Sequence, residues 1–171
     1  FGFIAFVYFN NATRDVYSRD IGDLVTAAFV FGIPHPPGYP LITLLGFIFT
    51  HLPIHLPPVT KMAYVSVLAS IIGIIFFYVF SLKATKSTLI AFIATAVLAF
   101  SYSFWLQTEI PEVFALSHSL LILIFFFAIR FYEEKKPRYF YLTLFFMGLS
   151  LTNQQAVIAV FPAVGLLILR G

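Results

Sequence analysis

The sequence predicts an all-α protein, a polytopic transmembrane helical bundle with two surface helices in its first extracytoplasmic loop. Hydrophobic residues make up 61% of the 171 positions and charged residues only 10%, whereas a soluble domain contains about 25% charged residues. Apolar stretches of about 20 residues, the length that a helix needs to cross a bilayer, recur through the second half of the chain. So few charges cannot cover a globular surface, and lipid must therefore cover much of this chain.

Composition also excludes several classes of function. The chain has no cysteine, so disulfides and thiolate chemistry are excluded. The net charge of +3 is spread over loops and is too small to indicate a nucleic-acid partner. No P-loop, zinc-ligand spacing, nucleophile elbow or dinucleotide fingerprint is present, so the sequence gives no support for a nucleotide-sugar substrate. The lipid bilayer is the first partner that composition predicts.

Membrane helices are predicted in order along the chain. Residues 1–9 are apolar but too short to span, so we interpret them as the end of a first membrane helix. Residues 62–171 are expected to supply about five more. These lie at 62–82, 88–105 and 114–132 and in two short helices within 140–169, divided by polar residues 152–155. The chain is interpreted as one transmembrane domain, residues 1–171, from the N-terminal part of a longer protein.

The apolar segment 39–51 decides the topology. Pro40 and Pro53 limit it to a helix of about 18 Å, which is too short to cross, so residues 10–61 are predicted to form one long extracytoplasmic loop. Seven basic residues then lie on the cytoplasmic side: Lys83, Lys86, Arg130, Lys135, Lys136, Arg138 and Arg170. A crossing segment would leave only Lys61 outside and would satisfy the positive-inside rule better. Helix length is the stricter physical limit.

The outer loop is predicted to contain two surface helices joined by a rigid elbow. Five apolar residues at helical spacing form one stripe of the first helix: Ile21, Leu24, Val25, Ala28 and Phe29. This helix is therefore expected to lie flat on the bilayer. Asp20 stands at its N-cap position, and Asp23 three residues later completes a pattern like a capping box. Four prolines then hold residues 34–40 extended, and this elbow carries His35 and Tyr39.

Three motifs resemble a known family. The run SRDIGDLVTAAFVFGIPHPPGYPLITLL resembles the first outer loop of the transmembrane protein 260-like protein O-mannosyltransferases, whose members read D-x-G-E-L-x-x-A-A and then G-x-x-H-P-P-G-Y-P-L. The segment FWLQTEIPEVF is similar to the family pattern F-W-x-Q-x-x-x-x-E-V-[YF], and GLSLTNQQ is similar to G-L-x-L-x-N-Q-H. The resemblance covers nearly the whole chain, and the HPPGYP element is its most specific part.

Three positions depart from the family pattern. Asp23 stands where members mostly have Glu, and it keeps a carboxylate. Residues 61–68 fall where members have an Arg-Val-Asn-Leu motif, and Ala63 replaces its Asn. Gln155 replaces the usual His. Because the last two changes remove a polar group and an imidazole, no role is assigned to these two positions.

The resemblance implies a GT-C-like fold, a helical membrane scaffold whose first outer loop supplies the catalytic acid. It implies an inverting glycosyltransferase that moves a sugar, mannose, from a polyprenyl- or dolichyl-phosphate donor to a Ser or Thr hydroxyl of an acceptor protein. The reaction would take place outside the cytoplasm, at the plasma membrane in a prokaryote or the endoplasmic reticulum in a eukaryote. No cofactor is required. A divalent metal at Asp20 and Asp23 would be compatible with this chemistry, but nothing in the sequence requires one.

Such a transfer needs a base for the acceptor hydroxyl and positive charge for the departing phosphate. Asp20, at the start of the first surface helix, is the predicted catalytic base. Four outer-side groups are candidates to meet the phosphate: Arg14, Arg19, His35 and Lys61. The predicted substrate-binding residues are Asp23, His35, Tyr39, Lys61, Glu109, Glu112, Asn153 and Gln154.

Each of these residues also has an ordinary structural explanation, such as helix capping for the two aspartates, a turn for His35 and interfacial anchoring for Tyr39. The alternative function is a secondary transporter or lipid-linked sugar flippase, because short interrupted helices are typical of transporters. Against it, the acids outside the cytoplasmic turn are all predicted on the outer face: Asp15, Asp20, Asp23, Glu109 and Glu112. A noncatalytic scaffold would leave this cluster without a purpose.

Overall fold

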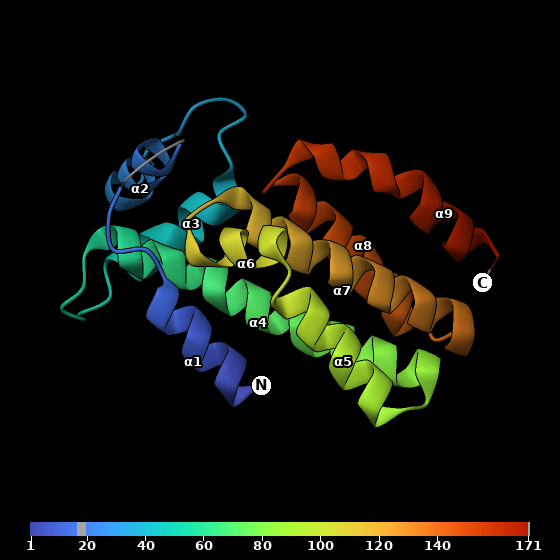
Figure 1. Cartoon of the computed structure of the whole chain (residues 1–171). Coiled ribbons are helices and arrows are strands. Elements are labelled where there is room, and N and C mark those ends of the chain that lie inside the picture. Colours follow the sequence, from blue (N-terminus) through green and yellow to red (C-terminus); the bar gives the residue numbers. More distant parts are fainter. Residues whose placement is uncertain (17–19, 171) are drawn as a thin grey trace.

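The computed structural model describes residues 1–16 and 20–170, and every regular element in this part of the chain is helical (Figure 1). The elements are α1 (Gly2–Asn11), α2 (Ile21–Val30), α3 (Pro40–Thr50), α4 (Pro58–Thr85), α5 (Thr88–Ala99), α6 (Tyr102–Glu109), α7 (Val113–Glu134), α8 (Pro137–Leu151), the short 3₁₀ segment η1 (Gln155–Val160) and α9 (Phe161–Leu169). The predicted all-α bundle is confirmed.

Helices α4 and α7 form the centre of the bundle. Each is long and apolar enough to cross a membrane, and the 28 residues of α4 correspond to about 42 Å. The two helices approach closely where Gly73 faces Ser119, because a Cβ on Gly73 would lie 2.7 Å from the Ser119 hydroxyl oxygen. That hydroxyl donates a hydrogen bond of 2.6 Å to the carbonyl oxygen of Ala69. A small residue and an interhelical hydrogen bond therefore hold this pair together, as is usual between membrane helices.

The prediction of one membrane helix at residues 88–105 is wrong. Helices α5 and α6 are bent by 60° where they meet, so together they form at most a broken span. The cause is local, because Ser101 donates both its N–H, at 3.2 Å, and its hydroxyl, at 2.8 Å, to the carbonyl oxygen of Leu98. A serine that bonds the preceding turn in this way competes with continuation of the helix. The expected number of about five membrane helices stays a prediction.

Helix α3 confirms the length argument for residues 39–51. Its 11 residues correspond to about 16 Å, too short to cross a bilayer. It lies between α2 and α4 (Figure 1). A Cβ on Gly46 would lie 2.8 Å from the Cβ of Ala28 in α2 and 3.2 Å from the Cε of Met62 in α4. Helices α2 and α3 are therefore packed onto the N-terminal part of α4, in one core with it.

The apolar stripe predicted for α2 is its buried face. Four of its members are buried: Ile21, Leu24, Val25 and Ala28. Phe29 is the exception, with 47% of its surface exposed. The stripe thus contacts protein, in the core that α2 shares with α3, α4 and α7, which differs from the expected flat arrangement on lipid.

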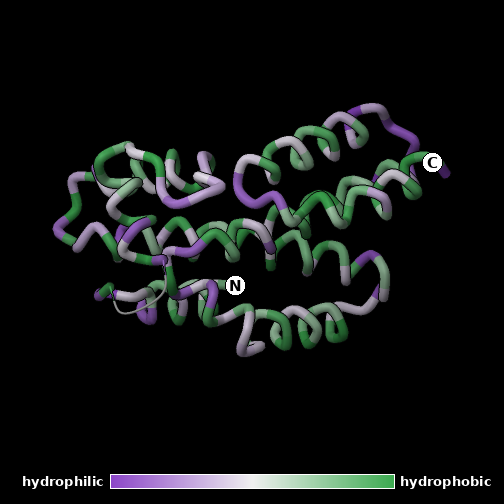
Figure 2. The backbone as a smooth tube through the Cα atoms, turned by 90° about the horizontal axis from the view of Figure 1, so that it is seen from above, coloured by the Kyte–Doolittle hydropathy of each residue, from purple (hydrophilic) through white to green (hydrophobic). Residues whose placement is uncertain are grey.

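The last apolar stretch is divided as predicted. Helix α8 ends at Leu151, and η1 and α9 follow after the break. Figure 2 shows hydrophobic positions along the helices and hydrophilic positions gathered in the turns at the two ends of the bundle. One of these ends brings together the α2–α3 elbow, the start of α7 and the α8–η1 break, and it holds the candidate site.

Candidate active site

The elbow between α2 and α3 reverses the chain through residues in the left-handed region of backbone space. Phe31 ends α2 with φ 53°, and Tyr39 precedes α3 with φ 41°. Gly38, with φ 95°, adopts its conformation without a steric penalty. A bulky residue in this region costs about 1–3 kcal/mol and is kept only where its surroundings fix it. The reversal brings His35 back to the first turn of α2.

Asp23 holds His35 in place. One carboxylate oxygen of Asp23 accepts a 2.8 Å hydrogen bond from the backbone N–H of His35 and lies 2.7 Å from the Nδ1 of the same residue. The backbone hydrogen bond and then the ring hydrogen bond lower the pKa of Asp23. The same ring hydrogen bond raises the pKa of His35, and the negative charges of Asp20, Asp23 and Glu112 add to that rise. The ring is therefore oriented with Nδ1 toward Asp23, and its cationic form is favoured.

Asp20 faces the other ring nitrogen. Its carboxylate lies 3.5 Å from the Nε2 of His35, and 62% of its side chain is exposed. Asp20 stands at the N-cap position of α2, but its side chain makes no capping hydrogen bond within the described chain. The predicted capping box is wrong, because the carboxylate of Asp23 is engaged by His35, twelve residues away. Two carboxylates thus flank one imidazole.

Tyr39 and Glu112 complete the cluster. The ring of Tyr39 meets that of His35 edge to face, with centroids 5.4 Å apart. Partial burial raises the pKa of Tyr39, and the charges of Asp20 and Glu112 raise it further. Glu112 stands at the N-cap of α7 and is only 4% exposed. Glu112, from a distant part of the sequence, therefore adds a further carboxylate to the cluster. Its negative charge raises the pKa of both His35 and Tyr39.

The α8–η1 break lies beside this cluster. Asn153 is 1% exposed, and its amide nitrogen donates to the carbonyl oxygen of Val113 at 2.9 Å and to the hydroxyl of Ser117 at 2.8 Å. Gln154 is half-buried and stands at the N-cap position of η1. The backbone N–H of Leu41 donates to the carbonyl oxygen of Thr152 at 3.1 Å. The start of α3, the start of α7 and the end of α8 thus meet at one place.

Two predicted site residues have other surroundings. The ammonium group of Lys61 donates to the carbonyl oxygens of Thr50, at 3.2 Å, and Leu52, at 2.8 Å, at the opposite end of α3 from Tyr39. The carboxylate of Glu109 accepts a hydrogen bond from the indole of Trp105 and lines a separate hollow of about 280 Å³.

The sequence also predicts that two arginines of the outer loop meet the phosphate. Arg14 is exposed. Arg19 lies outside the described residues, so its predicted role stays a prediction.

Sequence reasoning missed Ser117 and the backbone of Thr152. Ser117 is buried and accepts a hydrogen bond from Asn153. The signal that could have found it is a polar Ser-His-Ser group, residues 117–119, inside the apolar run of α7. The contact of the Thr152 carbonyl group could not be predicted from the sequence, because a backbone hydrogen bond between helices does not depend on the residue type.

Within residues 1–16 and 20–170, no three His, Cys, Asp or Glu side chains are arranged to hold a metal ion. Asp20 and Asp23 both face His35, with Nε2 near one carboxylate and Nδ1 at the other. The arrangement can hold and move a proton, because an imidazole whose pKa is raised lies between two carboxylates at the exposed end of a helical bundle.

Known proteins resemble this chain along most of its length. Residues 20–171 match the family model described as "Protein O-mannosyl-transferase TMEM260 N-terminal domain". The "Protein O-mannosyl-transferase TMEM260" of Mus musculus is 33% identical over 168 residues, which is 92% of this chain and 23% of the relative. The protein of the same description from Dictyostelium discoideum is 27% identical over 172 residues, which is 90% of this chain and 21% of the relative.

The chain spans between a fifth and a quarter of the length of these curated relatives. No solved structure matches it. The family match covers the elbow, the start of α7 and the α8–η1 break, so it includes every element of the described cluster. This chain belongs to the TMEM260 N-terminal domain family of protein O-mannosyl-transferases.

Proposed function

We propose that this chain carries the catalytic end of a membrane protein O-mannosyltransferase. The enzyme moves mannose from a polyprenyl- or dolichyl-phosphate donor to a Ser or Thr hydroxyl of a protein on the extracytoplasmic side. The acceptor oxygen forms a bond to C1 of the sugar while the bond from C1 to the phosphate oxygen breaks. The hydroxyl proton goes to the enzyme, and the electron pair of the breaking bond stays on the lipid phosphate. A single displacement of this kind inverts the anomeric centre.

The different states of the two aspartates give this proposal its strongest support. Asp23 accepts two hydrogen bonds from His35, and its lowered pKa makes it a weak base. Asp20 is mostly exposed and makes no capping hydrogen bond in the part of the chain that the structure describes. A general base must come within about 2.6–3.2 Å of the hydroxyl that it deprotonates, and an exposed carboxylate is able to do so. We therefore assign the base to Asp20.

His35 is suited to the departing phosphate. Its raised pKa favours the imidazolium, and Asp23 occupies Nδ1, so the Nε2–H is left to point toward the exposed side of the cluster where Asp20 lies. A preorganised cationic donor placed where negative charge develops stabilises the transition state more than the ground state. In the proposed mechanism His35 contacts the donor phosphate, while Glu112, Tyr39 and Gln154 contact the sugar or the acceptor.

The proposal is tested with the full-length protein that contains this chain, reconstituted with polyprenyl-phosphate-mannose and a Ser/Thr peptide library. Asp20→Asn should lower turnover by about 10²–10⁴-fold, the usual contribution of a general base, and should leave the KM for the donor within about threefold. Asp15→Asn is the matched control, because Asp15 is an exposed acid of the same loop whose side chain has no partner in the described chain.

Two results would count against the proposal. Full turnover of the Asp20→Asn enzyme would remove Asp20 as the base. Absence of sugar transfer by the unaltered enzyme with any lipid-phosphate donor would remove the enzymatic function, and movement of the lipid-linked sugar across the bilayer without transfer would favour a flippase.

A further inference from the structure

The end of α8 is bonded to the first turns of two other helices. The carbonyl oxygen of Thr152 accepts a hydrogen bond from the backbone N–H of Leu41 in the first turn of α3. The amide of the next residue, Asn153, donates to Val113 and Ser117 in the first two turns of α7. Because Pro40 has no N–H, Leu41 carries the first donor that α3 offers. Two adjacent residues therefore join two helix N-termini.

These two N-termini carry different parts of the candidate site. Helix α3 follows directly on Tyr39, and His35 lies in the elbow, four residues before Tyr39. Helix α7 follows directly on Glu112, its N-cap residue. The separation between Glu112 and the elbow is thus fixed by how α3 and α7 are held together, and the end of α8 supplies a hydrogen bond to each.

Asn153 has no donor left for a substrate. An amide NH₂ group offers two hydrogens, and both are used, over 2.9 Å to the Val113 carbonyl oxygen and 2.8 Å to the Ser117 hydroxyl. Its carbonyl oxygen is buried and accepts no hydrogen bond from any described residue. With the residue only 1% exposed, its polar atoms face the interior of the protein and not the exposed side of the cluster.

From this geometry we infer that Asn153 is a positioning residue, which sets the place of Glu112 relative to the Asp20–His35 cluster by pinning the first turns of α7. The effect on turnover that we expect from this inference rests on the proposed function. This positioning role replaces the direct substrate contact that the sequence predicts for Asn153. Loss of the amide would free the start of α7, and displacement of a site residue by about 1 Å can lower turnover by about 100-fold.

The experiment uses the full-length enzyme with Asn153→Ala, Ser117→Ala and Ser150→Ala. Ser117→Ala removes one of the two acceptors with little change of packing, which provides a milder test if Asn153→Ala folds poorly. Ser150→Ala is the matched control, since Ser150 is buried at the same helix end but its hydroxyl donates only within α8, to the carbonyl oxygen of Met147. Hydrogen–deuterium exchange of residues 110–120 reports the connection without any need for activity.

Faster exchange over residues 110–120 is expected in Asn153→Ala and, to a smaller extent, in Ser117→Ala, with no change in Ser150→Ala. Unchanged exchange in the Asn153→Ala protein would overturn the inference whatever the enzyme does. This readout is independent of the proposed function and therefore separates a failure of one from a failure of the other.

Catalysis is compared in a double-mutant cycle with Glu112→Gln. Asn153→Ala should lower kcat by about 10–100-fold, with a donor KM within about threefold, but should lower it by less than about twofold further when Glu112 is already replaced. Equal losses in both backgrounds would mean that Asn153 acts through general stability, and would overturn the inference. Full activity of Glu112→Gln alone would instead contradict the role that the proposed function gives to Glu112.

Discussion

Asp23 and His35 are joined by two contacts through one carboxylate oxygen, at 2.8 Å to the backbone N–H and at 2.7 Å to Nδ1. The pair links the first turn of α2 to the middle of the proline-rich elbow. Because one contact is to the backbone and the other to the ring, both the path of the elbow and the direction of the imidazole are fixed. The orientation of His35 toward Asp20 therefore depends on Asp23.

Asp23→Asn should move the alkaline side of the pH–activity profile to lower pH. The hydrogen bond to Asp23 raises the pKa of His35 above its ordinary value of 6.5, so the imidazolium persists to higher pH than in a free imidazole and is lost as pH rises through the raised pKa. Removal of the negative charge takes away the largest cause of this rise and therefore lowers the pKa of His35. The measurement is kcat/KM of the full-length enzyme against pH. An unchanged alkaline limb would mean that the ionisation of His35 does not limit the reaction.

The same pair makes the stability of the elbow depend on pH in two directions. The pKa of Asp23 is lowered from its ordinary value of 3.8, so its contribution to stability is present above that value and is lost as pH falls through the lowered pKa. The contribution of His35 is complete below 6.5 and declines above it. Thermal unfolding of the full-length protein should therefore depend more weakly on pH in Asp23→Asn than in the unaltered protein, both in acid and above neutrality.

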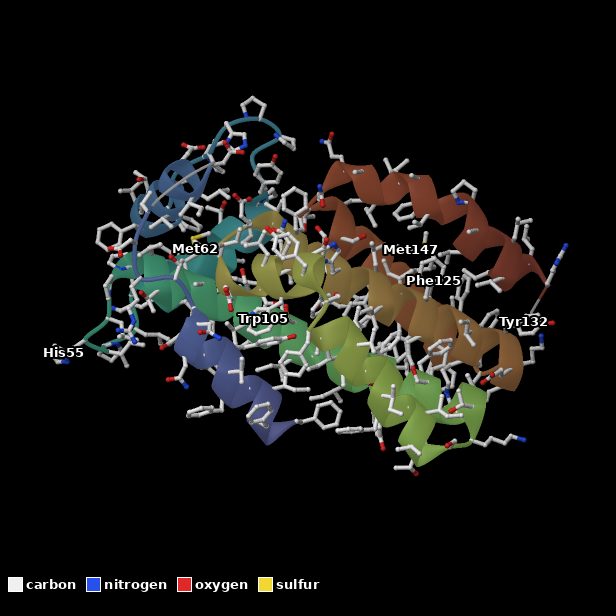
Figure 3. All side chains as sticks on the ribbon, viewed as in Figure 1. His55, Met62, Trp105, Phe125, Tyr132 and Met147 are labelled. Carbon is white, nitrogen blue, oxygen red and sulfur yellow. The ribbon has the colours of Figure 1, made fainter. Side chains whose placement is uncertain are left out.

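His35→Gln should lower turnover by about 10²-fold, which is the size of effect expected when a preorganised donor to a developing anion is removed. Glutamine keeps the backbone N–H that binds Asp23 but cannot carry the charge. His55→Gln is the control, since His55 is an exposed histidine in the α3–α4 loop, far from the elbow in Figure 3. Equal activities of the two variants would contradict the assigned contact between His35 and the phosphate.

The sequence predicted those parts of the fold that depend on helix length and hydrophobic period. The helices predicted at 62–82 and 114–132 lie within α4, with 28 residues, and α7, with 22 residues. These helices and the short α3 follow from apolar run length and the position of proline. The elbow that carries His35 and Tyr39 could also be predicted, because proline and glycine determine the backbone conformation locally. These predictions succeed because their causes lie within a few residues of one another.

Features decided by tertiary contact could not be predicted in this way. A capping box was expected for Asp20 and Asp23, but the carboxylate of Asp23 binds His35, twelve residues away, instead. Lys61 was expected near a phosphate, yet it binds the carbonyl groups of Thr50, the last residue of α3, and of Leu52, which follows the helix. In both cases the residue type is right for the predicted role, and the choice among partners is made by the packing of α2, α3 and α4.

Gly46→Ala should destabilise the protein by about 1–3 kcal/mol, the usual cost of adding a methyl group where no space exists. The new Cβ would lie 2.8 Å from that of Ala28 and 3.2 Å from the Cε of Met62, so α2 must move away from α3. Gly148→Ala is the matched control, because nothing lies within 4 Å of the added atom and alanine favours the helix by about 1 kcal/mol. Thermal unfolding in detergent measures both; a stabilised Gly46→Ala protein would contradict the close α2–α3 packing.

The sidedness of the bundle is testable with introduced cysteines, because the chain has none of its own. His55 precedes α4, and Lys135 follows α7 with its ammonium group over the ring of Tyr132. Figure 3 shows His55 and Tyr132 at opposite ends of the bundle. If α4, the bent α5–α6 pair and α7 each cross, the number of crossings between the two positions is odd and they lie on opposite sides.

A membrane-impermeant maleimide should then label His55→Cys only from the extracytoplasmic side of the membrane and Lys135→Cys only from the cytoplasmic side, in a full-length protein with any other cysteines replaced. Labelling of both positions from the outside would mean that α5–α6 does not cross. Lys135 and His55 would then lie on the same side of the membrane. In the bundle, however, α4 and α7 hold these two residues at opposite ends, about 40 Å apart along the packed helices. Both ends of the bundle can lie on one side of the membrane only if the bundle lies along the bilayer surface. The labelling pattern therefore decides whether the Asp20–His35 cluster faces a donor presented from the outer leaflet.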